Sequence, residues 1–258
     1  MSNSLTSDDP RYSEMFDVEK ETRASGSQVF GDLSGQMSQL REKGLVQKGS
    51  LHDLLELPKS DHEQYITPRQ HYTLFSFNAC DKAFRENLLF SSAVYKESPG
   101  VSSFGDVILT MTGKKHMNYR SVVQPMFIRP QAISHWRPKW IVGAVDSLLN
   151  RIENNETADL NMDLCARLPV HIVTEGIGMS GSKALEFREH LLNSMAHART
   201  SSREDLAHAS GEVTRMLNEL IDIRRKDPQD DVVSGLIKGD LLTEEGSKRK
   251  LSNEEIAA

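Results

Sequence analysis

The residues best suited to chemistry in this sequence are a histidine and an arginine four positions apart, His116 and Arg120. On a helix this spacing places both side chains on one face, one turn apart. Val123 extends the face, and Phe127 joins it if the helix continues past Pro125. Because imidazole and guanidinium donate charge-assisted hydrogen bonds to carboxylates, the face suits a flat apolar ligand with a pair of acidic groups at one edge. The alternative is a solvent-exposed polar face without a ligand.

The composition describes a water-exposed globular chain of 258 residues, long enough for one large domain or two small ones. Its 31 Lys and Arg against 37 Asp and Glu give a net charge of −6, which excludes a whole-protein attraction to nucleic acid or to anionic membranes. Cys80 and Cys165 are far apart and have no CxxC partner. This pattern argues against a disulfide scaffold or a zinc site and fits a reducing cytoplasm.

The first twenty residues are polar and acidic, so they match neither a signal peptide nor a membrane anchor. No other stretch approaches the length of a bilayer-spanning segment, and we expect a soluble, cytoplasmic protein. We expect residues 1–27 to form an N-terminal arm and residues 28–258 to form part of a single domain.

Apolar residues at helical spacing predict a mainly helical chain. Helices are expected over about residues 28–43, 78–89, 113–125, 130–152, 162–177, 182–198, 202–225 and 230–238. Asn78 is a candidate N-cap, and Pro169 within an expected helix is unfavourable. Residues 45–46 and 72–75 are rich in β-formers and predict short strands, which makes the fold class α+β with a small sheet.

The remaining segments lack a clear periodic pattern. Residues 51–70 carry no assignment, whereas residues 91–112 and 242–250 are expected to be loops without regular structure. Ser252 and Glu255 form a capping box, which predicts the start of a further helix.

Taken in order, several stretches resemble the N-terminal half of a bacterial-type cytochrome P-450, a haem-thiolate monooxygenase. They are YTLFSF (72–77), FSS (90–92), LTMTGKKH (109–116) followed by Tyr119 and Arg120, VQPMF (123–127), Leu168-Pro169, Ile177-Gly178, DDVVSGLI (230–237) and LSNEEI (251–256). The resemblance covers about residues 30–258 and implies a P-450 fold that stops at the start of the family's long central helix.

The resemblance also implies roles for particular residues. His116 and Arg120 would bind the two haem propionates, and Ile108 and Phe127 would pack against the macrocycle. The substrate-contact candidates come from the loop over the distal pocket and from the helix that roofs it: Phe104, Val107, Ile108, Leu191 and Met195. For each apolar residue the alternative is ordinary core packing.

The family's partners would be a small to medium apolar organic substrate, O₂ and a ferredoxin- or flavin-type electron donor. Lys114, Lys115 and Arg129 place positive charge near the His116 helix, where such a donor could dock; the alternative is a solvated patch. From the net charge and the lack of a bilayer-spanning stretch, we expect no nucleic acid and no membrane partner.

The family's axial cysteine lies in a motif of the form FxxGxxxCxG, and its thiolate favours cleavage of the O–O bond. Neither Cys80, in FNACDKAF, nor Cys165, in MDLCARL, matches this motif, so no metal ligand is assigned. We expect the sequence to be the N-terminal portion of a longer monooxygenase, inactive by itself, loosely folded and prone to aggregate. Two alternatives are a mainly helical interaction or regulatory protein without a cofactor, and a non-catalytic remnant of the family.

Overall fold

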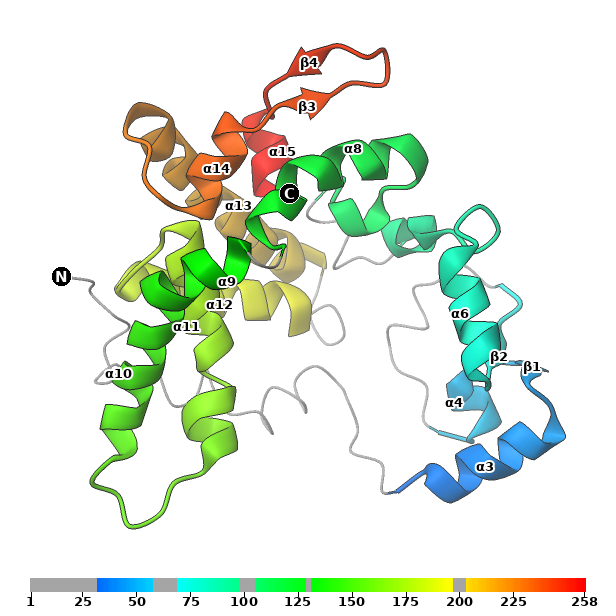
Figure 1. Ribbon diagram of the computed structural model, residues 1–258. Coiled ribbons are helices and arrows are strands. Elements are labelled where there is room, and N and C mark those ends of the chain that lie inside the picture. The colour runs from blue at the N-terminus through cyan, green and yellow to red at the C-terminus, as the bar shows by residue number, and fades with distance from the viewer. Residues whose placement is uncertain (1–31, 58–68, 98–104, 129–130, 197–202) are drawn as a thin grey trace.

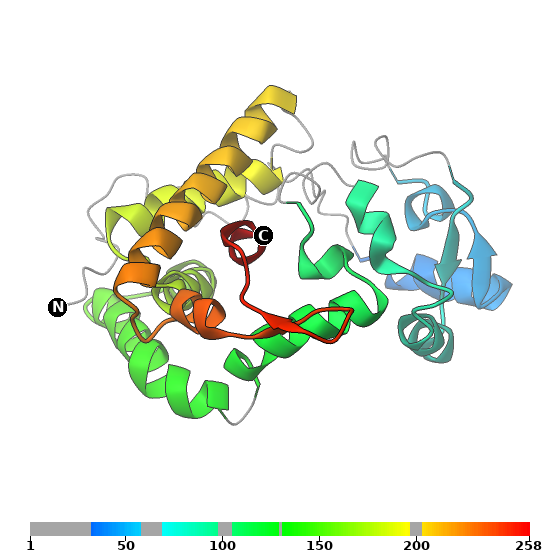
Figure 2. The same ribbon diagram turned by 90° about the horizontal axis from the view of Figure 1, so that it is seen from above.

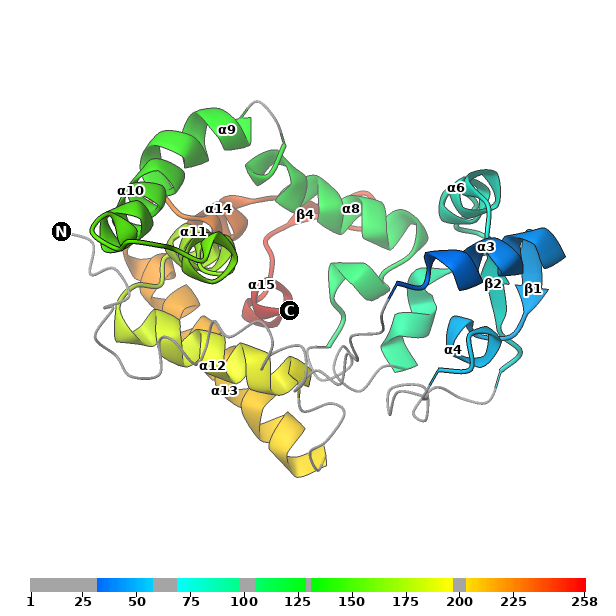
Figure 3. The ribbon, with the colours of Figure 1, turned by 90° about the horizontal axis from the view of Figure 1, so that it is seen from below.

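The computed structural model describes residues 32–57, 69–97, 105–128, 131–196 and 203–258. These residues form helices and two small two-stranded antiparallel sheets, which confirms the predicted class. Figure 1 shows elements α3 to α6 at one end of the molecule and α9 to α14 at the other, with α8 between them. The same arrangement is seen from above in Figure 2 and from below in Figure 3.

The N-terminal region is a small helix-and-sheet unit. It contains α3 (Ser34–Lys43), β1 (Val46–Lys48), α4 (Leu51–Leu54), β2 (Tyr72–Leu74) and α6 (Phe77–Arg85). The two strands pair antiparallel with Val46 opposite Leu74, and a small core of Leu40, Leu55 and Phe75 lies beside them. Both predicted strands are present, although the first covers residues 46–48 instead of 45–46.

One segment that carried no assignment contains a helix, and two expectations for α6 are corrected. α4 begins inside the unassigned stretch 51–70, because Ser50 accepts from the Asp53 amide and Asp53 accepts in return, a capping box. The N-cap of α6 is Ser76 and not Asn78, since the Ser76 hydroxyl accepts from the Ala79 amide at 3.2 Å. α6 ends at Arg85 rather than near residue 89.

The segment between α6 and α8 was expected to lack regular structure, and that expectation is wrong at two places. Residues Ser92–Glu97 and Ile108–Thr110 form 3₁₀ turns, named η1 and η2. α8 (Gly113–Val123) follows as predicted. It does not continue to Phe127, because Pro125 lies in the 3₁₀ turn η3 (Gln124–Met126), which Phe127 caps.

The long helix expected after residue 130 is present with an interruption. α9 (Gln131–Trp136) runs through a π-helical turn, η4 (Arg137–Ile141), into α10 (Val142–Ile152). The turn contains Pro138 and buries the Trp140 ring beside Gly176. Proline removes one backbone donor, which accounts for a local departure from regular α-helical bonding.

The next helix begins later than predicted, which corrects the expected start at Met162. Asn161–Cys165 form a separate π-helical turn, η5, and α11 runs over Leu168–Ile177. Pro169 thus lies in the first turn, where its missing N–H would have no helical partner, and not in the interior. Gly178 ends α11 in the left-handed conformation with φ 93°.

The main hydrophobic core lies among α12 (Ser182–Ala196), α13 (Arg203–Lys226) and α14 (Val232–Lys238). Leu185, Val213, Ile221 and Val233 are almost completely buried there. Asp231 caps α14 by accepting from the Ser234 amide at 2.8 Å.

The charged stretch 242–250 is not a loop, contrary to expectation. β3 (Leu241–Leu242) and β4 (Lys248–Arg249) pair antiparallel in a hairpin. The hairpin leads into α15 (Asn253–Ala257), which begins with the predicted capping box of Ser252 and Glu255. In Figure 1 the hairpin lies beside α8, although more than a hundred residues separate them.

Candidate functional site

His116 and Arg120 lie on α8, which is helical over both residues, so the two side chains share one face. His116 is half-buried and Arg120 is exposed. Neither side chain forms a hydrogen bond or ion pair with any other described residue. The face thus carries two donors whose hydrogen-bonding capacity is not used within the described parts of the chain.

A cavity of about 200 Å³ lies between α8, the preceding loop and α15. Its apolar lining comes from Ile108, Met111, Val123, Leu236, Leu251 and Ile256. Ile108 lines this cavity together with Tyr119 and Val123 of α8, and half-buried Val107 directly precedes Ile108. His116 and Arg120 are not among the residues that line this cavity.

The charge beside this cavity is partly neutralised. Asp106 accepts from Lys115 at 2.5 Å and from Lys96 at 2.8 Å. These two hydrogen bonds hold the pKa of the Asp106 carboxyl well below its usual range, at about 2. Lys114 donates to the backbone carbonyl of Glu244 in the hairpin at 2.8 Å. The charge of Lys115 is therefore paired, and Arg129 lies outside the described residues.

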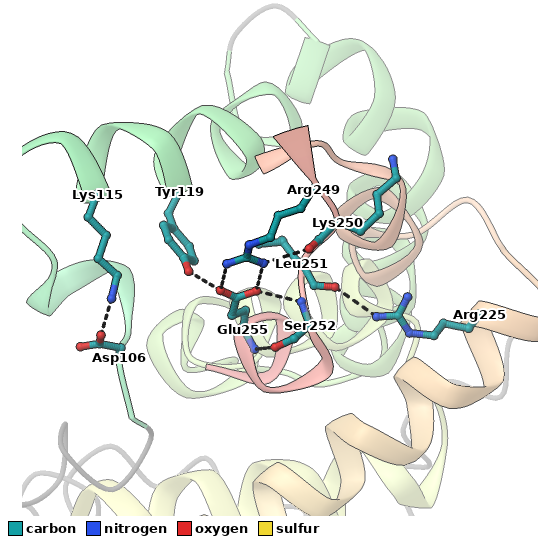
Figure 4. Close-up of polar contacts among 9 residues, drawn as sticks. All are labelled: Asp106, Lys115, Tyr119, Arg225, Arg249, Lys250, Leu251, Ser252 and Glu255. Carbon is teal, nitrogen blue, oxygen red and sulfur yellow. Dashed lines mark hydrogen bonds and ion pairs between the residues drawn. The ribbon is translucent and has the colours of Figure 1, made fainter. Parts of the chain in front are cut away.

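A polar network that sequence analysis missed joins α8 to the hairpin and α15 (Figure 4). The Tyr119 hydroxyl donates to Glu255, and Arg249 binds the same carboxylate with both terminal nitrogens, at 2.5 and 2.6 Å. The pKa of Glu255 is lowered to about 2, mainly by its hydrogen bonds with Arg249. The pKa of Tyr119 is raised by burial and by its hydrogen bond to Glu255. The only local signal was the capping box at Ser252, which fixes Glu255 but does not indicate Tyr119.

The other predicted site residues are dispersed. Phe127 is 50% exposed and its ring contacts Trp136 edge-on, with centroids 5.1 Å apart. Leu191 packs against the main core instead of facing the α8 cavity. Phe104 lies outside the described residues, and so does the side chain of Met195 in α12. The structure therefore places His116 and Arg120 on one face of α8 and Ile108 in the cavity beside Tyr119 and Val123, and the roles assigned to all of these residues stay predictions.

Neither cysteine lies on α8 or lines its cavity. Cys80 is half-buried in α6, with its sulfur 3.9 Å from the Leu74 carbonyl oxygen, and Cys165 is exposed at the end of η5. Within the described residues, His, Cys, Asp and Glu form no group of three that could hold a metal ion. In the same residues no helix is both long and apolar enough to cross a bilayer.

Comparison with known proteins gives a consistent class. No family model matches the chain. YjiB of Bacillus subtilis (strain 168), which is named as a cytochrome P-450, is 27% identical over 194 residues, covering 72% of this chain and 46% of YjiB. The nocardicin C N-oxygenase of Nocardia uniformis subsp. tsuyamanensis is 28% identical over 134 residues, or 50% of this chain and 32% of that protein.

Among solved structures, substrate-free CYP109E1 from Bacillus megaterium superposes with a TM-score of 0.65 and 20% identity, covering 88% of this chain and 55% of that one. The chain therefore spans about half the length of these P-450 proteins. The fold of the described residues is that of a cytochrome P-450. More particularly, the chain resembles the N-terminal half of a bacterial-type cytochrome P-450.

Cytochromes P-450 bind haem, and the residues on α8 fit one edge of it. Haem is a flat apolar ring with two carboxylates at one edge. His116 and Arg120 are donors of the kind that carboxylates accept from, without a partner among the described residues, and Ile108 and Val123 line an apolar cavity beside α8. The fit concerns the propionate edge alone, since neither cysteine is placed beside this face.

Proposed function

We propose that this chain supplies the propionate clamp and part of the substrate pocket of a haem-dependent monooxygenase. The observation that carries the proposal is the pair His116 and Arg120, which share one face of α8 without a partner among the described residues. A P-450 fold over most of the chain supports a haem as the ligand of this face.

The residues divide into two proposed groups. His116 and Arg120 hold the two propionates by charge-assisted hydrogen bonds, while Ile108 and Phe127 cover the ring and exclude water from it. When bound, haem supplies the activation of O₂. Val107, with Phe104, Leu191 and Met195 as further candidates, contacts the substrate and orients it.

The proposed substrate is a small to medium apolar organic molecule, into which one oxygen atom from O₂ is inserted. Apolar Val107 and Ile108 before α8 support this class. CYP109E1, which shares the fold, has been solved in complex with corticosterone and with testosterone. These steroids are ligands of that protein and serve here only as examples of the chemical class.

We propose a ferredoxin- or flavin-type electron donor near Lys114, Lys115 and Arg129. Because Lys115 is paired with Asp106, Lys114 offers more uncompensated charge to an acidic partner. The 258 residues alone are proposed to be inactive, since neither cysteine has the sequence context of an axial thiolate. This statement is tested by assaying the purified chain with haem, reductant and O₂.

The haem clamp is tested by titrating the purified chain with haem and following the absorbance of the bound porphyrin. We expect His116→Ala and Arg120→Ala each to weaken binding by roughly ten- to a hundredfold, because each loses one charge-assisted hydrogen bond of about 1.5–3 kcal/mol. Arg85→Ala in α6 is the matched control, since Arg85 pairs with Asp81 in the same helix. Equal haem affinity in the double variant and the original chain would contradict the clamp.

A second function from another class is an interaction protein without a cofactor. Large apolar side chains on and after α6 are strongly exposed, including Phe77 at 83%, Phe84 at 88% and Leu88 at 94%. This alternative predicts no saturable haem binding. The haem titration therefore separates the two functions.

A further inference from the structure

α8 carries the clamp but has no fully buried side chain of its own. Apolar packing therefore contributes less to its position than it does for α13, where Val213 and Ile221 are buried. Polar contacts with later parts of the chain must contribute more. Among the described residues, the side-chain hydrogen bonds that α8 makes to the hairpin and α15 come from Lys114 and Tyr119.

The two contacts differ in strength. Lys114 reaches a backbone carbonyl on the exposed hairpin, and its long side chain loses considerable rotamer entropy when held there. Tyr119 reaches the carboxylate of Glu255 with a stiff side chain that has few rotatable bonds, and a hydrogen bond to a charged acceptor is the stronger kind.

Glu255 is fixed independently of Tyr119. Arg249 binds it with two nitrogens, and the Ser252 amide donates to it at 2.8 Å. These contacts hold the acceptor at one position in the first turn of α15, as Figure 4 shows. Tyr119 therefore binds to a preorganised carboxylate and does not need to order it.

The start of α15 is in turn held to the main core. Arg225 at the end of α13 donates to the Leu251 carbonyl at 3.2 Å and to the Asn253 side-chain oxygen at 2.9 Å. A continuous path of hydrogen bonds and backbone thus connects the Tyr119 hydroxyl to α13 (Figure 4). Through this path, α8 is held in position relative to α13, which belongs to the main hydrophobic core.

Tyr119 is adjacent to Arg120 and three residues after His116. At about 100° per residue, a rotation of α8 about its axis moves all three side chains together. We propose that Tyr119 is a positioning residue that, through Glu255, sets the rotation of α8 and so aligns His116 and Arg120 with the two propionates. This inference rests on the proposed function, because alignment has a consequence only if the pair binds haem.

The test compares haem with its dimethyl ester, in which both propionates lack charge. Tyr119→Phe removes only the hydroxyl and keeps the ring. We expect it to weaken haem binding by the purified chain roughly three- to tenfold, the range that corresponds to losing one hydrogen bond. Binding of the dimethyl ester should not change, because the aligned donors have no carboxylates to bind.

Tyr72→Phe is the matched control, since the exposed Tyr72 hydroxyl makes no hydrogen bond with a described residue. Glu255→Gln should reproduce the selective loss, and the double variant with Tyr119→Phe should lose no more than the worse single variant. Hydrogen exchange should rise in α8 and stay constant in α13 in the Tyr119→Phe variant.

Several results would overturn the inference. Unchanged haem affinity in Tyr119→Phe would remove the positioning role, and equal losses for haem and its ester would indicate general destabilisation. Two results would overturn the proposed function together with this inference. One is that the original chain does not bind haem, and the other is that Arg120→Ala weakens the binding of haem and of its ester equally. A selective effect of Arg120→Ala without one of Tyr119→Phe would overturn this inference alone.

Discussion

The region around α12 and α13 and the region around β1 and β2 bury apolar side chains on very different scales. In the former, Leu185, Val213 and Ile221 are at most 2% exposed. In the latter only Leu40, Leu55 and Phe75 form a buried cluster among the described residues, while Phe77 and Phe84 on α6 are more than 80% exposed. The first region can be stable through its own contacts, whereas the second presents an apolar surface.

The candidate clamp lies between these regions. α8 takes its alignment from the well-packed side, through the hairpin and α15, and its preceding loop comes from the poorly packed side. The comparison therefore predicts that substitutions in the main core affect the clamp indirectly, while substitutions on α6 leave it intact.

The largest expected effect comes from the buried ion pair beside the main core. Asp231 is 5% exposed, pairs with Arg224 and caps α14, so Asp231→Ala leaves the Arg224 charge without its partner. We expect the free energy of unfolding to fall by roughly 3–5 kcal/mol. Urea unfolding, monitored by circular dichroism, measures this free energy. Asp230→Ala is the control because the Asp230 side chain is 71% exposed; an equal loss in both variants would contradict the prediction.

The next effect contrasts the two regions directly. Ile221→Ala removes a side chain that is 0% exposed and leaves a cavity, which should cost roughly 2–5 kcal/mol of unfolding free energy. Leu88→Ala removes one that is 94% exposed and should change it by less than about 0.5 kcal/mol. Similar changes in both variants, measured by urea unfolding, would show that the two regions do not differ in packing.

A pH effect arises in α11, next to the main core. Burial, followed by the charges of Arg151 and Arg167, lowers the pKa of His171 from 6.5 to about 4. The unfolded chain therefore binds more protons between these values, and the unfolding free energy should fall by up to about 3 kcal/mol as the pH drops from 6.5 to 4. Urea titrations across this window test it. The same pH dependence in His171→Gln would assign the effect to other groups.

The smallest effect on stability should come from the exposed apolar surface of α6. Phe77→Ser with Phe84→Ser should change the unfolding free energy by less than about 0.5 kcal/mol for each residue. The same change should reduce self-association, since it removes two exposed rings. Sedimentation measures the association. An unaltered tendency to associate would place the responsible surface elsewhere.

Local patterns in the sequence predicted much of this structure. The spacing of His116 and Arg120, the β-formers at 72–75 and the capping box at Ser252 each depend on neighbouring residues, and each corresponds to an observed element. Pro169 was misplaced because a proline favours a helix start as well as disrupting a helix interior, and the pattern alone did not distinguish the two.

Features that depend on distant residues could not be predicted. The sequence of the β3–β4 hairpin resembles a charged loop, because its two-residue strands are too short to show an alternation of apolar and polar residues. Tyr119 and Glu255 are separated by 136 residues, and no local pattern relates them. The fold class could thus be predicted from the sequence, whereas the contacts that hold α8 in place are visible only in the three-dimensional structure.

The contacts that place α8 also determine when it can be placed. Its partners Glu244 and Glu255 are 130 residues or more further along the chain than Lys114 and Tyr119. On a ribosome, which adds about 5–20 residues per second, the helix leaves the exit tunnel several seconds before these partners do. Closing so long a segment carries an entropic cost that local helix formation does not. During synthesis α8 therefore reaches its final orientation late, after the hairpin and α15 have left the tunnel.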